Sequence, residues 1–216
     1  MKKNITLIIV LLSFIFVPQL DAQFGINVGI AVPIGDFADD GGAEGDGFAK
    51  TGFNVGLSYD IPFGAIEGLS WTITGSLLYN AMDWDKAFDL VSGEDMDGGK
   101  YLNIPLLTGL KIKYGISETA AMFGMATAGV NLSTMTDAKY TDGNYWEEYS
   151  VNTVGSFAFS IGAGVILMDR YSLSLNYMGL GEPDHEIDYS DSDGYSGSFD
   201  EEQKISAITI TAGIFF

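Results

Sequence analysis

The C-terminal stretch Lys204-Ile205-Ser206-Ala207-Ile208-Thr209-Ile210-Thr211-Ala212-Gly213-Ile214-Phe215-Phe216 decides the fold that the sequence predicts. From residue 208 onward the even positions are apolar, whereas the odd positions 207–213 are small or weakly polar. Alternate residues of a β-strand point to opposite faces, so one face of this strand is apolar. The stretch also ends on an aromatic residue without a charged tail. This pattern favours the closing strand of a membrane-spanning β-barrel, with the aromatic ring at the bilayer interface.

Seven earlier segments show a similar alternation. The eight expected strands cover residues 24–34, 51–63, 69–82, 101–114, 120–134, 149–168, 171–180 and 204–216. Their connections are alternately long and short, and the long ones cover residues 36–50, 83–100, 135–148 and 181–203. These four long connections contain all but five of the 29 acidic residues. Outer-membrane barrels have short periplasmic turns and long external loops. The sequence therefore predicts an all-β, eight-stranded antiparallel up-and-down transmembrane barrel with four external loops and three periplasmic turns.

The N-terminus indicates export. Lys2 and Lys3 precede an apolar run over residues 5–17, and a small residue, Ala22, lies before the expected cut at Gln23. These are the parts of a secretory signal peptide. We therefore expect a cleaved signal at residues 1–22 and one barrel domain at residues 23–216. The expected location is the outer membrane of a Gram-negative bacterium, with extracellular loops and both termini in the periplasm.

Composition restricts the chemistry. The formal net charge is −19, so phosphate backbones would be repelled and nucleic acid is an unsuitable partner. The absence of cysteine excludes disulfides, thiolate metal sites and a lipidated N-terminal cysteine. One histidine is present.

The expected inward faces carry mostly Gly, Ala, Ser, Thr and Asn. Their candidate ions are Asp60, Lys111 and Lys113. Because buried charges must pair or stay hydrated, we expect Asp60 to pair with Lys111 or with Lys113. The alternative is that all three lie in water at the periplasmic rim. A soluble lipocalin-like barrel, with its apolar face around a ligand, is the structural rival.

Outward aromatic residues gather near the expected strand ends and predict two interfacial girdles. They are Phe24, Phe53, Tyr59, Phe63, Trp71, Tyr79, Tyr114, Tyr149, Tyr171, Tyr177 and Phe216.

Two weak candidate sites lie in the fourth long loop. Asp188, Asp191, Asp193 and Asp200 alternate with other residues around Gly194, which is reminiscent of calcium loops. The spacing departs from the EF-hand pattern, so a solvated, weakly cation-attracting loop is the default.

His185 lies among acids with Ser190 and Ser192 nearby, and a Ser/His/acid hydrolase would need such groups. Sequence proximity alone does not make a catalytic set, and we predict no catalytic residue, no cofactor and no enzyme.

The run Tyr101-Leu102-Asn103-Ile104-Pro105-Leu106-Leu107 resembles one that is common in PorT-like or OmpX-like small outer-membrane β-barrel proteins of Bacteroidetes. The ending from Gly213 to Phe216 and the Ala22-Gln23 signal end are similar as well. The resemblance implies the barrel fold and the outer membrane. It supplies no catalytic residues, and it implies a secretion role for a few members.

The expected function is therefore a monomeric, non-catalytic barrel that contacts outer-membrane lipid and presents acidic loops. An extracellular protein, a glycan or a divalent cation would be the partner at the loops, because binding residues commonly lie on loops held by a rigid scaffold. One alternative is an accessory component of a secretion or envelope-assembly system. A second is an outer-membrane lipid-modifying enzyme.

Overall fold

The computed structural model describes residues 23–39, 47–63, 66–84, 87 and 94–216. The expected signal peptide at residues 1–22 lies outside the described residues. Within the described residues, no helix is long and apolar enough to cross a membrane.

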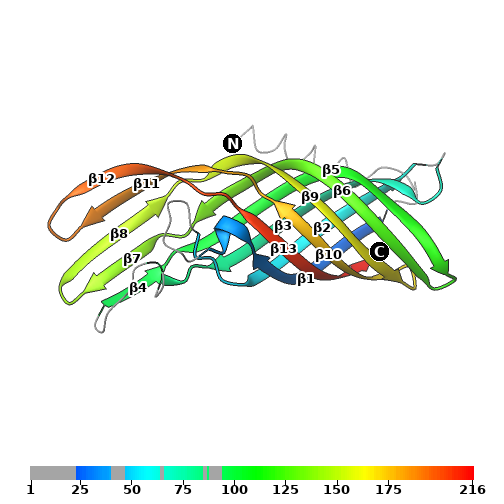
Figure 1. Ribbon diagram of the computed structural model, residues 1–216, viewed down its shortest axis with the longest axis horizontal. Coiled ribbons are helices and arrows are strands. Elements are labelled where there is room, and N and C mark those ends of the chain that lie inside the picture. Colours follow the sequence, from blue (N-terminus) through cyan, green and yellow to red (C-terminus); the bar gives the residue numbers. More distant parts are fainter. Residues whose placement is uncertain (1–22, 40–46, 64–65, 85–86, 88–93) are drawn as a thin grey trace, which may run out of the picture.

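Eight antiparallel strands form a closed barrel, in the spatial order β1-β13-β10-β9-β6-β5-β3-β2. The barrel strands are β1 (Gln23–Pro33), β2 (Gly52–Pro62), β3 (Leu69–Ala81), β5 (Lys100–Ser117), β6 (Ala120–Met135), β9 (Val154–Leu167), β10 (Tyr171–Gly179) and β13 (Ser206–Phe215). The C-terminal strand closes the ring by pairing with β1 from Gly25↔Phe215 to Pro33↔Ala207. Short turns join β2 to β3, β5 to β6 and β9 to β10 at one end, here called the turn end (Figure 1). The predicted barrel is confirmed.

Apolar side chains cover the outside of the barrel wall. Ile30, Leu106 and Ile161 are 46%, 51% and 59% exposed, whereas the inward neighbours Ala31 and Ser160 are almost completely buried. This arrangement excludes the lipocalin-like alternative for the barrel, because that alternative needs the large aliphatic face around a ligand. Two of the outward aromatics, Phe24 and Tyr59, lie at the turn end as expected, since they pair with each other near the start of β1 and the end of β2.

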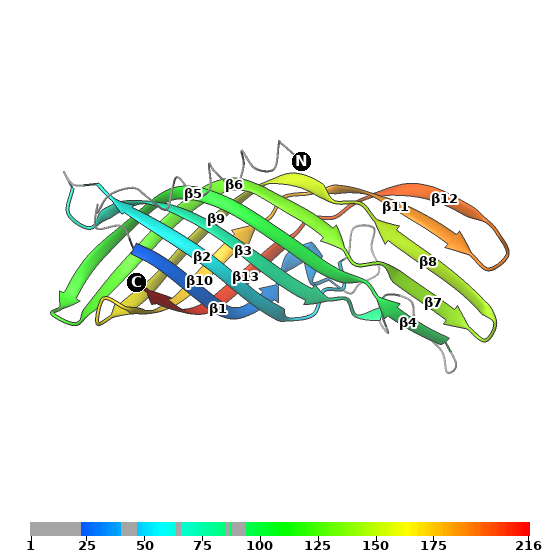
Figure 2. The same cartoon turned by 180° about the vertical axis from the view of Figure 1, so that it is seen from behind.

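The opposite end of the barrel continues into a second sheet, which the sequence did not predict. Five strands in the order β12-β11-β8-β7-β4 form what we call the extension (Figures 1 and 2). They are β4 (Glu94–Gly98), β7 (Ala138–Asp142), β8 (Tyr145–Val151), β11 (Asp184–Asp191) and β12 (Ser196–Glu202). The long connections over residues 83–100, 135–148 and 181–203 were predicted as loops without an assigned structure, and parts of them form these strands. Paired strands satisfy their backbone donors and acceptors, which an irregular loop over this length would leave to water.

The first long connection folds back onto the barrel. The short 3-10 helix η2 (Gly35–Phe37) places Phe37 in a buried cluster, with its ring edge-on to Tyr101 at 5.0 Å between centroids. The hydroxyl of Tyr101 donates a hydrogen bond to the carbonyl oxygen of Gly47 at 2.8 Å. This part of the connection therefore packs over the extension end of the lumen.

The expected sixth strand, residues 149–168, is interrupted. β8 ends at Val151 and β9 begins at Val154, so Asn152 and Thr153 separate them. Because side-chain direction alternates with a period of two, this break changes which parity faces inward. Tyr149 and Val151 point into the extension, whereas Phe157 points outward from the barrel. The prediction that Tyr149 belongs to the outer aromatic girdle is therefore wrong.

Candidate functional site

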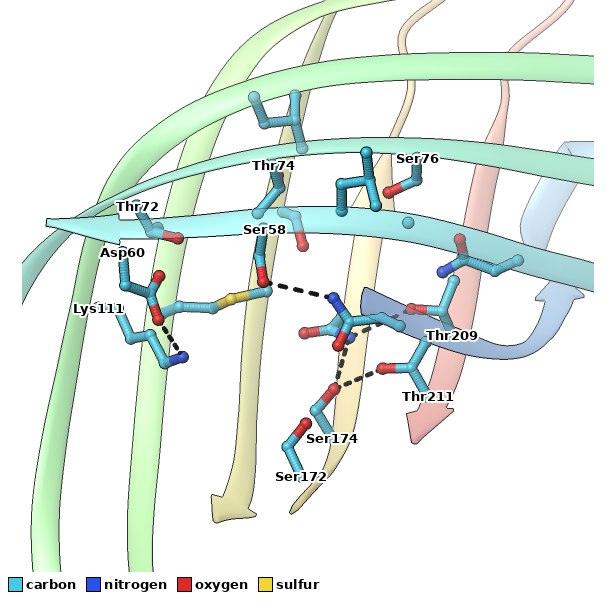
Figure 3. Close-up of a pocket in the computed structure, with 18 of the residues that line it drawn as sticks. Ser58, Asp60, Thr72, Thr74, Ser76, Lys111, Ser172, Ser174, Thr209 and Thr211 are labelled. Atoms are coloured by element: carbon cyan, nitrogen blue, oxygen red, sulfur yellow. Dashed lines mark hydrogen bonds and ion pairs between the residues drawn. The ribbon is translucent and has the colours of Figure 1, made fainter. Parts of the chain in front are cut away.

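A polar space inside the barrel is the first candidate site, and we call it the lumen chamber. Its volume is about 70 Å³. Figure 3 shows small hydroxyl and amide side chains from β2, β3, β10 and β13 lining it. The Ser174 and Thr211 hydroxyls are 2.6 Å apart, and the Asn176 amide donates to the Thr209 hydroxyl at 3.3 Å. The chamber can hold a few water molecules, since a water needs about 10–15 Å³ measured in this way.

An ion pair crosses the lumen chamber toward the turn end. The ammonium of Lys111 donates to the Asp60 carboxylate at 2.7 Å, and each side chain is only 7% exposed. Rings of Phe123 and Phe215 lie with their centroids 4.6 Å and 4.5 Å from the Lys111 nitrogen. The predicted pairing of Asp60 with Lys111 is thus confirmed. Lys113 instead pairs with Asp169 on the surface, at 3.3 Å.

Apolar clusters lie at both ends of the lumen chamber. Phe123, Ile166 and Phe215 form one at the turn end. A larger one at the extension end includes Phe37 and Tyr101. The expectation of a lumen filled by small side chains is therefore incomplete, because the large inward rings of Phe123 and Phe215 pack against the ion pair. The alternation of β13 places Phe215 inward, but its depth in the lumen depends on the register with β1.

The extension contains a second candidate site, here called the extension pocket, of about 130 Å³. Apolar side chains dominate its lining. They are Met82, Trp84, Met96, Tyr101, Met135, Ala138, Tyr149, Val151, Ile187 and Phe199. The polar lining residues are His185, Glu201 and Gln203.

The polarity of the wall is inverted between barrel and extension. In β11, the inward residues His185 and Ile187 are buried, whereas Asp184, Glu186 and Asp188 are exposed outward. In β12, Phe199 and Glu201 pair with Ile187 and His185 and so share their inward side. Around the pocket, β11 and β12 are therefore mainly apolar on the inner side and acidic on the outer side, whereas the barrel is mainly polar inside and apolar outside. This is the pattern expected where a strand passes from lipid into water.

Burial shifts the pKa values of the two ionisable groups in the extension pocket, His185 and Glu201. It lowers the pKa of His185, against the opposing effects of a hydrogen bond to the Asn152 carbonyl and the Asp184 carboxylate. Burial also raises the pKa of Glu201 above that of an ordinary glutamate. Both groups are thus biased toward their neutral forms.

His185 does not meet the serines that sequence proximity suggested. Its Nε2 lies 3.2 Å from the hydroxyl of Ser133 on β6, and its Nδ1 lies 3.2 Å from the carbonyl oxygen of Asn152. A serine next to a histidine satisfies one requirement of nucleophilic catalysis. Ser133 is, however, fully buried and is not among the residues lining the lumen chamber or the extension pocket. The pair therefore joins β11 to the barrel wall.

The calcium candidates lie in the β11–β12 hairpin. The Asp191 carboxylate accepts backbone hydrogen bonds from Asp193 and Tyr195, both at 2.9 Å, and so stabilises the turn. Asp188 and Asp200 lie on the outward acidic face of the two strands. Among the described residues, no three histidine, aspartate or glutamate side chains are grouped so as to hold a metal ion.

Comparisons with known proteins give the fold. No family model matches the sequence, and no curated protein matches it. A major outer membrane protein from Thermus thermophilus is similar in structure, with a TM-score of 0.55, 11% identity and coverage of 91% of this chain and 100% of that chain. The outer membrane protein OprG from Pseudomonas aeruginosa gives a TM-score of 0.52, 13% identity and coverage of 90% and 96%. The chain thus has the fold of the small eight-stranded barrels found among outer-membrane proteins, and the PorT-like resemblance remains a prediction.

Proposed function

We propose that this protein is an integral outer-membrane protein of a Gram-negative bacterium, and that its barrel anchors the extension outside the cell as a binding module. The observation that carries the proposal is the inversion of polarity between barrel and extension. An apolar outer band suits lipid, and an acidic outer face suits water. The outer-membrane barrels with the same fold support this location.

The lining of the extension pocket favours binding over catalysis. The inward residues of the extension form an apolar pocket with few polar groups, which is the usual composition of a ligand site. His185 lines the pocket, but its partner Ser133 is fully buried and does not line it, so this pair offers no accessible nucleophile for a lipid-modifying activity. The acidic exterior would serve a cationic or cation-bridged partner.

Orientation can be tested with single cysteines, because the natural chain has none. Ser192 lies exposed at the tip of the β11–β12 hairpin, and Glu118 lies exposed in the turn between β5 and β6. In intact cells, we expect a membrane-impermeant maleimide to label S192C but not E118C, and to label both after lysis. Labelling of E118C alone in intact cells would show the opposite orientation. Recovery of the protein without detergent would exclude the membrane location.

An accessory role in secretion or envelope assembly is the second candidate function. It is favoured by the broad, exposed acidic face of β11 and β12, which suits docking onto a basic protein surface. Crosslinking in cells through S192C distinguishes the candidates. A discrete large complex supports the accessory role, and a lone species opposes it.

A further inference from the structure

The size of the extension pocket limits what can enter it. A cavity of about 130 Å³ is close to the volume of about 150 Å³ that accommodates benzene in an apolar protein interior. The pocket therefore suits a single ring or a chain of a few carbons, and it is too small for a complete acyl chain.

One carboxylate in this pocket lacks a cationic partner. Glu201 lines the pocket from β12 and remains in contact with solvent. Within the described part of the chain, no lysine or arginine forms an ion pair with it. The nearby Glu147 differs, because the hydroxyls of Tyr145 and Tyr149 both donate hydrogen bonds to its carboxylate. Glu201 is thus the carboxylate that a ligand would meet.

The surroundings of Glu201 favour a positive charge. Trp84, Tyr149 and Phe199 contribute aromatic rings to the same lining, and ring faces attract ammonium groups. On the opposite, outward faces of β11 and β12, five further carboxylates add negative charge to this part of the extension, namely Asp184, Glu186, Asp188, Asp200 and Glu202. Desolvation raises the pKa of Glu201, so an ammonium group beside it would relieve the cost of the ionised form.

We propose that the extension pocket binds a small apolar amine, with its ring or short alkyl chain among the methionine and aromatic side chains and its ammonium group against the Glu201 carboxylate. This inference deepens the proposed binding role and rests on it. A ligand of the same shape with a carboxylate would be repelled by Glu201, and a neutral one would leave Glu201 without a counter-charge.

The probe is phenethylamine, titrated calorimetrically into the purified mature protein in a neutral maltoside detergent. Phenylacetate and 2-phenylethanol have the same ring with a negative charge and with no charge. We expect the amine to bind saturably. The alcohol and the acid should bind at least roughly tenfold more weakly, because neither can offer a positive charge to Glu201. Absence of saturable amine binding, or equal binding of all three compounds, would overturn the inference.

The chain provides a matched control. E201Q should weaken amine binding roughly tenfold, whereas E202Q, on the opposite side of the same strand, should change it by less than about twofold. I187W should abolish binding by filling the pocket, and retention of the heat-dependent gel shift should show that each variant is folded. Equal effects of E201Q and E202Q would contradict the assignment.

Cysteine labelling in cells is independent of these titrations. A failed titration with correct labelling would therefore remove the amine proposal and leave the proposed location in place.

Discussion

At the scale of single residues, the Asp60–Lys111 pair lets the barrel interior be tested. K111M should lower the free energy of unfolding by about 3 kcal/mol, since removing one partner leaves a buried charge uncompensated. The double variant D60N/K111M should recover part of that loss, which equilibrium urea unfolding in lipid vesicles would measure. K113M is the control, and it should cost less than about 1 kcal/mol because the Lys113–Asp169 pair is exposed. Equal costs for K111M and K113M would show that the lumen pair is hydrated like a surface pair.

His185 gives the second prediction at this scale. Burial lowers its pKa, so the folded protein favours the neutral ring and the unfolded chain, with a pKa near 6.5, binds the proton more readily. The stability that depends on the neutral ring is therefore complete above about pH 6.5 and is lost as the pH falls below that value. As the chain has one histidine, NMR of the untagged protein should show one imidazole titration, with a midpoint below that of the urea-unfolded protein. A folded midpoint at or above the unfolded one would contradict the burial of His185.

At the scale of elements, the barrel strands could be predicted because most of them alternate between apolar and small or polar residues, with lipid on one side and the lumen on the other; the alternation is weak only in β6. Parity and the cost of isolated charges limited the partner of Asp60 to Lys111 or Lys113, and only the structure shows that Lys111 is the partner. The extension could not be predicted in this way. Its strands are short and acidic on one side, and the two-residue break at Asn152 and Thr153 moves Tyr149 to the inner face. The signal that could have found it was the inward-facing pair of apolar residues Ile187 and Phe199 within an otherwise acidic loop.

The β11–β12 hairpin gives the prediction at this scale. Its outer part can be shortened by replacing residues 188–198 with Asn-Gly, because Ile187 and Phe199 are already paired. We expect the barrel to lose less than about 1 kcal/mol of unfolding free energy, since distant structural units contribute almost independently. The control is removal of residues 213–216, which eliminates pairs that close the barrel and should prevent folding. Thermal and urea unfolding monitored by circular dichroism would measure both. Failure of the shortened hairpin variant to fold would show that the extension is part of the folding unit.

At the scale of the whole molecule, the filled lumen predicts that the barrel is a scaffold rather than a pore. Apolar clusters at both ends, and the ion pair beside the turn-end cluster, occupy a lumen that eight strands already make narrow. In planar lipid bilayers we therefore expect no stable conductance steps from the purified protein under conditions where a trimeric porin gives large ones. Reproducible steps that survive in K111M but disappear when Phe215 is replaced by Trp would show that the lumen conducts.

The central claim is that the apolar outside of the barrel faces lipid and the acidic outside of the extension faces water. Spin labels at L106C, on the outer barrel wall, and at S150C, on the outer face of the extension, test it in vesicles. The account predicts that the label at residue 106 collides with dissolved oxygen and is shielded from a water-soluble nickel chelate, whereas the label at residue 150 shows the reverse. Free access of the chelate to residue 106 would contradict the account.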